Sequence, residues 1–250
     1  MSVNGRLIPE LVAINPALII FDKDGTLIDI KAMWGTWLRQ LAQELEIAAG
    51  LPIVTALFAV MAFEPGSGRI DPAGPLAIAP VPKLRQLTLN VLVEAGLSTA
   101  EAEQALATAW QPPDPVASAH PLTDLNRLFT SLRAGGLKIG IATSDDRAPT
   151  QATLVGLGLS NLVDALACAD DVQSIKPAPD MVLAICRALD IAPARAVMVG
   201  DNPDDLRMGR AAGVGLVVGV LSGVSPVALL TPYADIILPS VAGLIRPNQA

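Results

Sequence analysis

Aromatic residues are scarce in this chain, at 3% of its 250 residues, so its core must be built from Leu, Val, Ile and Ala. Charged residues are few as well, at 16%, and no basic run of useful length occurs. With a net charge of −7, the chain lacks the clustered Lys and Arg of a nonspecific nucleic-acid surface, and we expect no nucleic-acid partner. This balance does not exclude an anionic substrate held by a few local cations.

Cysteine is nearly absent. Cys168 and Cys186 are the only two, and they offer neither a disulfide framework nor metal-ligand spacing. Both lie in apolar surroundings, which is typical of reduced core cysteines in a cytoplasm. The N-terminus is a poor signal peptide, because its one cationic side chain, Arg6, is followed by Pro9 and Glu10. We therefore expect a cytoplasmic protein.

One long stretch carries no charge at all. Residues 211–234 are long enough to span a bilayer, but glycines and prolines interrupt them repeatedly. A buried strand over residues 215–220, a turn and a short helix explain the stretch better. We expect no membrane partner.

Short apolar runs, rich in β-branched residues, alternate with helical patterns. The runs lie at 17–21, 138–142, 165–168, 196–200, 215–220 and 236–238. The helical patterns after residue 122 lie at 123–134, 149–156, 179–189 and 203–212. Alternating strands and helices predict a parallel sheet that is covered by helices on both faces. Because both faces of such a sheet are buried, its strands show no alternation of polar and apolar residues. The predicted fold class is α/β, with a Rossmann-like doubly wound parallel sheet.

A long insert separates the first two strands. It far exceeds the dozen or so residues that a crossover needs. Apolar residues at helical spacing predict helices over 31–48, 51–62, 82–95 and 99–110, with Pro/Gly-rich stretches at 65–82 and 111–121. We predict an all-helical domain over residues 29–118, inserted into an α/β core domain of residues 1–28 and 119–250.

Polar side chains follow four of the predicted strands. In an open parallel sheet, ligands bind at the carboxyl ends of the strands, so these side chains should lie together. They are suited to binding a phosphoryl group together with a hard cation. In chain order they are Asp22 with Asp24, Thr143 with Ser144, Lys176, and Asp201 with Asp205.

Each residue type suits one part of phosphoryl transfer. A carboxylate such as Asp22 can attack phosphorus, and Asp24 can protonate the leaving oxygen and later deprotonate the attacking water. Thr143 or Ser144 can bond the equatorial oxygens of the transferring group, while Lys176 supplies a point charge to them. An acid at a fourth strand end, Asp201, offers an oxygen ligand suited to Mg²⁺.

The four segments resemble the four motifs of the haloacid dehalogenase superfamily, specifically its phosphatase branch with a helical cap. The matching segments are Asp22-Lys23-Asp24-Gly25-Thr26, then Thr143, then Lys176-Pro177-Ala178-Pro179-Asp180, then Gly200-Asp201 through Asp205. The resemblance implies a Mg²⁺-dependent phosphatase that hydrolyses a small phosphorylated metabolite, phosphoglycolate-like or sugar-phosphate-like, through an aspartyl-phosphate intermediate. It leaves the identity of the substrate open.

The resemblance also implies individual roles. Asp22 would be the nucleophile and Asp24 the general acid/base. The Asp22 carboxylate, the Asp24 backbone carbonyl and Asp201 would hold Mg²⁺, and Asp205 would orient metal-bound water. Lys23 departs from the family pattern, in which the residue between the two acids is more often apolar.

The insert would be the cap that closes over the substrate. Its first helix carries Lys31 and Trp34, which we expect as substrate contacts, although Trp34 and Trp37 at this spacing are more often packing residues. Outside the site, Asp145 and Asp146 are expected to cap the helix that follows them. The apolar insert leaves a monomer and a homodimer both open.

Three other functions compete with a phosphatase. A phosphotransferase or mutase of the β-phosphoglucomutase type would share the aspartyl-phosphate but pass it to another sugar. Carbon–halogen hydrolysis, as in the family's namesake, is disfavoured because those enzymes lack a second carboxylate at the position of Asp24. A catalytically silent sugar-phosphate-binding module would have lost one of the acids or Lys176, and none is missing.

Overall fold

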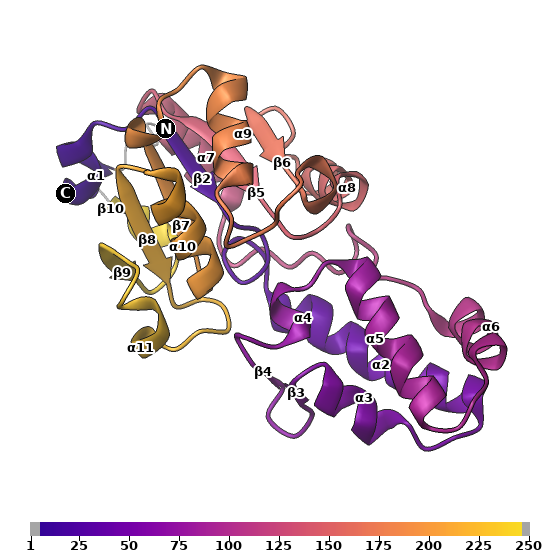
Figure 1. Ribbon diagram of the computed structural model, residues 1–250. Coiled ribbons are helices and arrows are strands. Elements are labelled where there is room, and N and C mark those ends of the chain that lie inside the picture. Colours follow the sequence, from indigo (N-terminus) through magenta and orange to yellow (C-terminus); the bar gives the residue numbers. More distant parts are fainter. Residues whose placement is uncertain (1–5, 247–250) are drawn as a thin grey trace. The chain divides into compact units, whose positions relative to one another are not determined.

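The computed structural model describes residues 6–246, which divide into two compact units. One unit is formed by the residues up to Asp29 and from Ala119 on, and the other is Ile30–Ser118 (Figure 1). The insert predicted over residues 29–118 thus differs from the second unit by one residue at its start. Its role as a cap over a substrate stays a prediction.

A six-stranded sheet in the order β6-β5-β2-β7-β8-β9 forms the centre of the first unit. All neighbouring strands in it are parallel. This confirms the predicted α/β class. The strands are β2 (Leu18–Phe21), β5 (Lys138–Ala142), β6 (Ala165–Ala167), β7 (Ala196–Gly200), β8 (Leu216–Val220) and β9 (Ile236–Leu238).

Side chains of the central strand alternate between two buried faces. Leu18 and Ile20 pack with helices α9 (Asp180–Leu189) and α10 (Pro203–Ala212) in one apolar cluster. On the opposite face, Phe21 stacks on Phe129 of α7 (Leu125–Ala134), with the ring centroids 5.4 Å apart. Every residue of β2 is therefore buried, which explains its apolar run without polar alternation.

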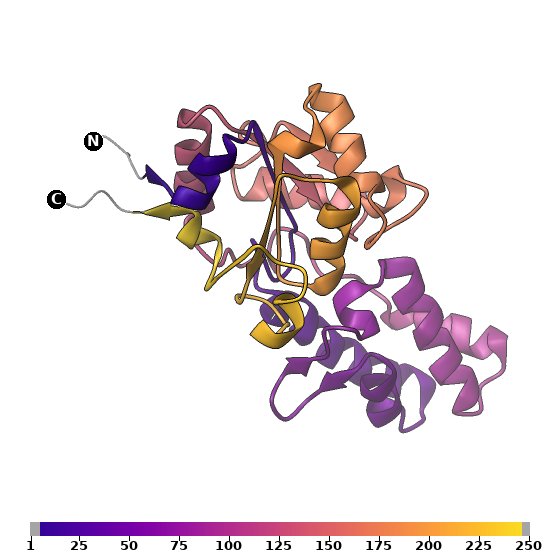
Figure 2. The same cartoon turned by 60° about the vertical axis from the view of Figure 1, so that its left-hand side comes forward.

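Short elements complete the first unit. Strands β1 (Arg6–Leu7) and β10 (Ile245–Arg246) pair antiparallel, so the two ends of the described chain lie side by side (Figure 2). The remaining helices of the first unit are α1 (Pro9–Ile14), α8 (Arg147–Gly156), η2 (Ala169–Asp171), η3 (Pro193–Arg195), α11 (Val227–Leu230) and η4 (Val241–Leu244). Between residues 6 and 246, no helix has the length and apolar character needed to cross a membrane.

The second unit is helical apart from one hairpin. A π-helical turn, η1 (Lys31–Gly35), runs directly into α2 (Thr36–Ala49), where a single helix was predicted. The prediction of an all-helical insert missed the antiparallel pair β3 (Phe63–Glu64) and β4 (Arg69–Ile70), which Gly68 closes at a φ of 70°. The remaining helices are α3 (Val54–Val60), α4 (Pro75–Ile78), α5 (Val81–Glu94) and α6 (Thr99–Ala109).

The tryptophans form part of the packing of this unit. Trp37 packs edge-on against Trp34 at 5.4 Å and against Trp110 at 5.3 Å between ring centroids. Its indole Nε1 donates to the carbonyl of Gln111 at 2.6 Å. The three tryptophans thus connect the first helix of the insert to residues 110 and 111, which follow its last helix.

A single carboxylate, Asp164, ties three donors together just before β6. It accepts the backbone N–H of Ile139 at 2.9 Å and the Lys138 ammonium at 2.9 Å, and it pairs with Arg133. Burial alone would raise the pKa of Asp164. The hydrogen bond from Ile139 and the charges of Lys138 and Arg133 outweigh burial and lower that pKa.

Replacing Asp164 by Asn is expected to lower the free energy of unfolding by about 1–3 kcal/mol at pH 7, because a charged acceptor is lost. A lowered folded-state pKa makes this stabilisation complete above the unfolded-state pKa and lost as the pH falls through the folded-state value. Wild-type stability should therefore fall more steeply with acidification below about pH 4 than that of the variant. Urea unfolding at several pH values measures both the stability difference at pH 7 and its pH dependence, and hydrogen exchange in β5 gives a second, local measure.

The exposed Glu10→Gln serves as the control for this comparison. A variant Asp164→Asn as stable as the wild type at pH 7 would contradict the assignment.

Candidate active site

The register of the sheet brings three of the predicted residues to one edge. Phe21 of β2 lies beside Ile141 of β5 on one side and Val199 of β7 on the other. Asp22 comes one residue after this row, and Thr143 and Asp201 come two residues after it. Parallel pairing alone therefore places a carboxylate, a hydroxyl and a second carboxylate at the same end of the sheet.

Lys176 joins this group from the loop that follows β6 and η2. Its ammonium lies 2.5 Å from Asp22 Oδ1 and 2.7 Å from Asp205 Oδ1. Burial, followed by the charge of Asp205, raises the pKa of Asp22 to about 6, because Lys176 offsets only part of these two effects. Burial would lower the pKa of Lys176, but Asp205 and Asp22 outweigh it and raise that pKa. Lys176 therefore stays charged between two acids.

Three buried acids converge beside this lysine. Asp22, Asp201 and Asp205 each place a carboxylate oxygen within 4.8 Å of the other two. Burial, followed by the charges of Asp22 and Asp205, raises the pKa of Asp201. Among residues 6–246, Lys176 is the one cation that forms an ion pair with this acidic trio. The trio therefore carries more negative charge than its protein surroundings compensate.

Hydrogen bonds fix the orientation of the two acids that follow β7. Thr26 Oγ1 donates to Asp201 Oδ1 at 3.2 Å, and the backbone N–H of Val224 donates to Asp201 Oδ2 at 3.0 Å. The backbone N–H of Asn202 donates to Asp205 Oδ2 at 3.1 Å, as part of the N-terminal capping box of α10. Both carboxylates are therefore held by hydrogen bonds from the protein itself.

A loop after β8, residues 221–225, also belongs to the site, and the sequence reasoning missed it. Besides the bond from Val224 to Asp201, Ser222 Oγ donates to the carbonyl of Gly25 at 2.9 Å. A Cβ at Gly223 would overlap the Asp201 carboxylate, and one at Gly25 would come within 2.6 Å of it. Gly223, three residues after the end of a predicted strand, was the available signal, because glycine permits such close approach.

Asp24 is paired with its own neighbour in the sequence. The Lys23 ammonium lies 2.8 Å from Asp24 Oδ1, 2.6 Å from Asp24 Oδ2 and 3.0 Å from Asp145 Oδ2. Burial raises the pKa of Asp24 to about 6, against the opposing effect of Lys23. A carboxyl group with a pKa near neutrality can both give and take a proton.

The prediction that Asp145 and Asp146 cap α8 was wrong. Asp145 is turned to Lys23, and Asp146, at the cap position, makes no side-chain capping bond. Asp170 accepts the backbone N–H of Arg147 instead, at 2.9 Å. The buried Lys23 explains the difference, since an ammonium that is 2% exposed needs carboxylate partners.

The remaining predicted residues have mixed surroundings. Thr143 is buried, and its Oγ1 accepts the backbone N–H of Asp145 at 3.2 Å, while Ser144 is half-buried. In the second unit, Lys31 is exposed and Trp34 is buried against Trp37. Roles for these four residues in substrate binding stay predictions.

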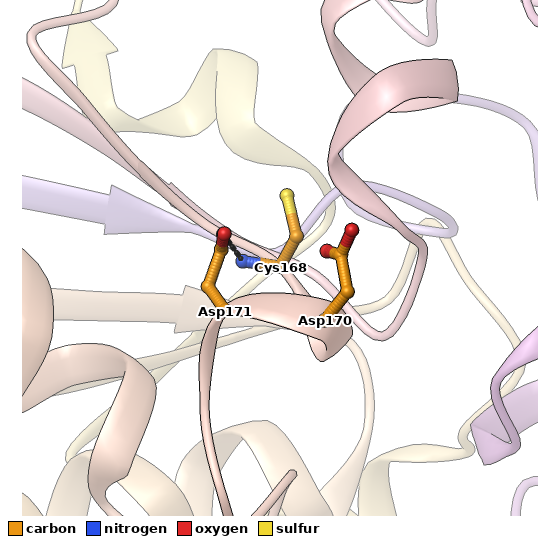
Figure 3. Close-up of side chains that lie close together, drawn as sticks. All are labelled: Cys168, Asp170 and Asp171. Atoms are coloured by element: carbon orange, nitrogen blue, oxygen red, sulfur yellow. Dashed lines mark hydrogen bonds between the residues drawn. The ribbon is translucent and has the colours of Figure 1, made fainter.

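A second acidic group, Cys168 with Asp170 and Asp171, serves the structure of a loop (Figure 3). Asp171 accepts the backbone N–H of Cys168 at 2.8 Å and pairs with Arg147 at 2.6 Å. Burial raises the pKa of the Cys168 thiol to about 12, so the sulfur stays protonated and is a poor metal ligand. These contacts bind η2 to the start of α8.

Comparisons with known proteins agree with one another. A family model for haloacid dehalogenase-like hydrolases matches residues 16–213. The phosphoglycolate phosphatase of Rhodospirillum rubrum is 30% identical over 212 residues, which cover 81% of this chain and 79% of that protein.

Two solved structures share the fold. A haloacid dehalogenase phosphatase from Thermococcus onnurineus has a TM-score of 0.63 at 20% identity, covering 91% of this chain and 95% of the other. A β-phosphoglucomutase from Clostridium difficile has a TM-score of 0.57 at 19% identity, covering 90% and 92%.

The acidic trio should cost stability when no cation is bound. Asp201→Asn keeps the size of the side chain and an acceptor for Val224, so we expect it to raise the free energy of unfolding in EDTA at pH 8 by about 1–3 kcal/mol. A raised folded-state pKa means that the penalty is absent at pH values below the unfolded-state pKa, grows as the pH rises from the unfolded-state to the folded-state value, and is complete above the latter. The gain should therefore shrink towards pH 4. Urea unfolding at several pH values measures it.

Asp204→Asn is the matched control, because Asp204 lies three residues after Asp201, in the first turn of α10, and pairs with Arg207 at the surface of that helix. Its effect should stay within about 0.5 kcal/mol. If Asp201→Asn were less stable than the wild type in EDTA at pH 8, the charge repulsion assigned to the trio would be refuted.

Proposed function

Because this chain belongs to the haloacid dehalogenase-like hydrolase family, we propose that it is a Mg²⁺-dependent phosphatase that cleaves a small phosphorylated metabolite through an aspartyl-phosphate at Asp22. The family match and the Rhodospirillum rubrum relative confirm the predicted enzyme class, a phosphoric monoester hydrolase. One observation carries the proposed chemistry. It is the buried acidic trio with Lys176 bridging Asp22 and Asp205.

The trio has the chemistry of a Mg²⁺ site. Carboxylate oxygens are the ligands that Mg²⁺ prefers, and three buried acids, with one ammonium paired to them in the described part of the chain, leave negative charge to be neutralised. Asp22 and Asp201 would hold the ion, with Asp205 beside it and the Asp24 backbone carbonyl as a further ligand. When bound, Mg²⁺ would neutralise the charge that develops on the phosphoryl oxygens.

The residues divide the reaction between them. An Asp22 oxygen attacks phosphorus, and the bond to the leaving oxygen breaks as Asp24 gives that oxygen its proton. Asp24 then takes a proton from water, whose oxygen attacks the phosphorus and releases phosphate and free Asp22. Lys176 and the Thr143 hydroxyl hold the equatorial oxygens through both steps. The balance is one ester and one water consumed, and one alcohol and one phosphate formed.

The proposed substrate is a small phosphorylated carboxylic acid of the phosphoglycolate type. Support comes from the Rhodospirillum rubrum phosphoglycolate phosphatase, whose similarity spans most of both chains. A phosphotransferase of the β-phosphoglucomutase type is the alternative that uses the same Asp22 chemistry. The likeness to a β-phosphoglucomutase structure is one of fold and does not separate the two.

Removing the nucleophile or the metal should abolish turnover. Asp22→Asn is expected to lower kcat for p-nitrophenyl phosphate by at least about 1,000-fold, because the amide cannot form the acyl-phosphate. EDTA should inactivate the wild type, and added Mg²⁺ should restore it. Phosphate release measures both; a mock purification from cells that lack the gene gives the background of contaminating phosphatases, and Asp204→Asn controls for the loss of a nearby surface carboxylate. Substantial activity in Asp22→Asn above that background would refute the proposed reaction.

A panel of phosphorylated metabolites tests the substrate. We expect kcat/KM for phosphoglycolate to exceed that for hexose phosphates by about tenfold or more, a difference of about 1.4 kcal/mol in transition-state binding. A hexose phosphate at the top of the panel would contradict the proposed substrate while leaving the reaction in place. Phosphorylated Asp22 that resists water and passes its phosphoryl group to a second sugar would instead establish a phosphotransferase.

A further inference from the structure

Lys23 is a buried cation that the proposed reaction does not use. Its side chain is 2% exposed, and its ammonium contacts both oxygens of Asp24 and one oxygen of Asp145. The two acids come from different strand ends, since Asp24 follows β2 and Asp145 follows β5. One ammonium therefore links the loop that carries the nucleophile to the loop that carries Thr143.

The fold of the acidic loop does not require this side chain. The backbone carbonyl of Lys23 already closes the turn by accepting the N–H groups of Leu27 at 2.8 Å and Ile28 at 3.0 Å. A buried ion pair usually adds little stability over apolar residues of similar volume, because desolvation consumes most of the attraction. The charge on Lys23 thus has no evident structural purpose beyond the two carboxylates that it contacts.

The geometry around Asp24 supplies a purpose. A carboxylate that transfers protons must keep a narrow range of positions, and its short side chain can rotate about two bonds. An ammonium that contacts both oxygens restricts that rotation. Asp145 holds the other side of the ammonium and takes no part in the proposed reaction.

The anchor on the Asp145 side is itself fixed. The backbone N–H of Asp145 donates to Thr143 Oγ1 at 3.2 Å, and its carbonyl accepts the N–H of Ala169 at 3.0 Å. The contacts therefore run without a gap from Asp24 through Lys23 and Asp145 to Thr143.

We propose that Lys23, anchored by Asp145, is a positioning residue that holds Asp24 in place for proton transfer to the leaving group. This inference rests on the proposed function, in which Asp24 is the general acid. Lys23 itself neither contacts the substrate nor gives up its proton. Its effect appears only where the leaving oxygen needs that proton.

Leaving groups of different basicity separate this role from a structural one. An alkoxide needs a proton from Asp24 to depart, whereas 2,4-dinitrophenolate departs without one. We expect Lys23→Met to lower kcat/KM for an alkyl phosphate by about 10- to 100-fold, the cost of a misplaced catalytic group. For 2,4-dinitrophenyl phosphate the change should stay within about threefold, because no proton is needed. The value of kcat/KM is used because it reports the phosphorylation of Asp22 and not the later hydrolysis.

Three further variants are compared with Lys23→Met. Asp24→Asn sets the full size of the selective loss, and Lys138→Met is the control, because Lys138 also pairs with a carboxylate beside β5 but outside the site. Asp145→Asn keeps the contact between Lys23 and Asp24 and loosens the anchor, so it should give a smaller loss in the same direction. Asp145→Asn decides the question if Lys23→Met fails to fold, as judged by circular dichroism.

The outcomes distinguish the inference from the proposed function. An equal loss on both substrates, or no loss, in the folded Lys23 and Asp145 variants overturns the role of Lys23. If Asp24→Asn leaves the ratio of the two kcat/KM values unchanged, or if the wild type hydrolyses neither ester, the result refutes the proposed function itself and not only the role of Lys23. A selective loss in Lys23→Met, intermediate in Asp145→Asn and absent in Lys138→Met, supports the positioning role.

Discussion

The repulsion among three buried carboxylates at one edge of a parallel sheet is the constraint on which the rest of the core unit depends. Asp22, Asp201 and Asp205 lie close enough to share a cation, and among residues 6–246 Lys176 is the one cation that forms an ion pair with them. Such a cluster costs stability in the absence of a ligand. We interpret that cost as the source of the site's affinity for a divalent cation, because the charge of the cation offsets the repulsion among the carboxylates.

Rigid surroundings keep the acids from relaxing away from one another. The all-parallel sheet fixes the ends of β2, β5 and β7 in register, and hydrogen bonds from Thr26 and Val224 fix Asp201. Gly25 and Gly223 let backbone approach the Asp201 carboxylate where any side chain would collide with it. The same rigidity would pre-organise these groups for the phosphoryl transfer that we propose.

The sequence predicted the parts of this arrangement that follow from strand order. Apolar runs indicated the strands, and parallel strands present their carboxyl ends together, so Asp22, Thr143 and Asp201 could be assigned to one edge. It did not predict the pairing of Lys23 with Asp145 or the contribution of the loop over residues 221–225, because these contacts join segments far apart in the chain. The caps expected from Asp145 and Asp146 failed for the same reason, since Asp145 is drawn to a buried ammonium more than a hundred residues away.

The central claim is that Asp22 carries the phosphoryl group during turnover. It is tested most directly by quenching the enzyme in acid while it hydrolyses a phosphate ester and reducing the product with borohydride, which converts an aspartyl-phosphate to homoserine. Mass spectrometry should find homoserine at position 22 in the wild type when Mg²⁺ is present, and not when EDTA replaces it. Full turnover with no modified residue, or with the modification on another aspartate, would contradict the account.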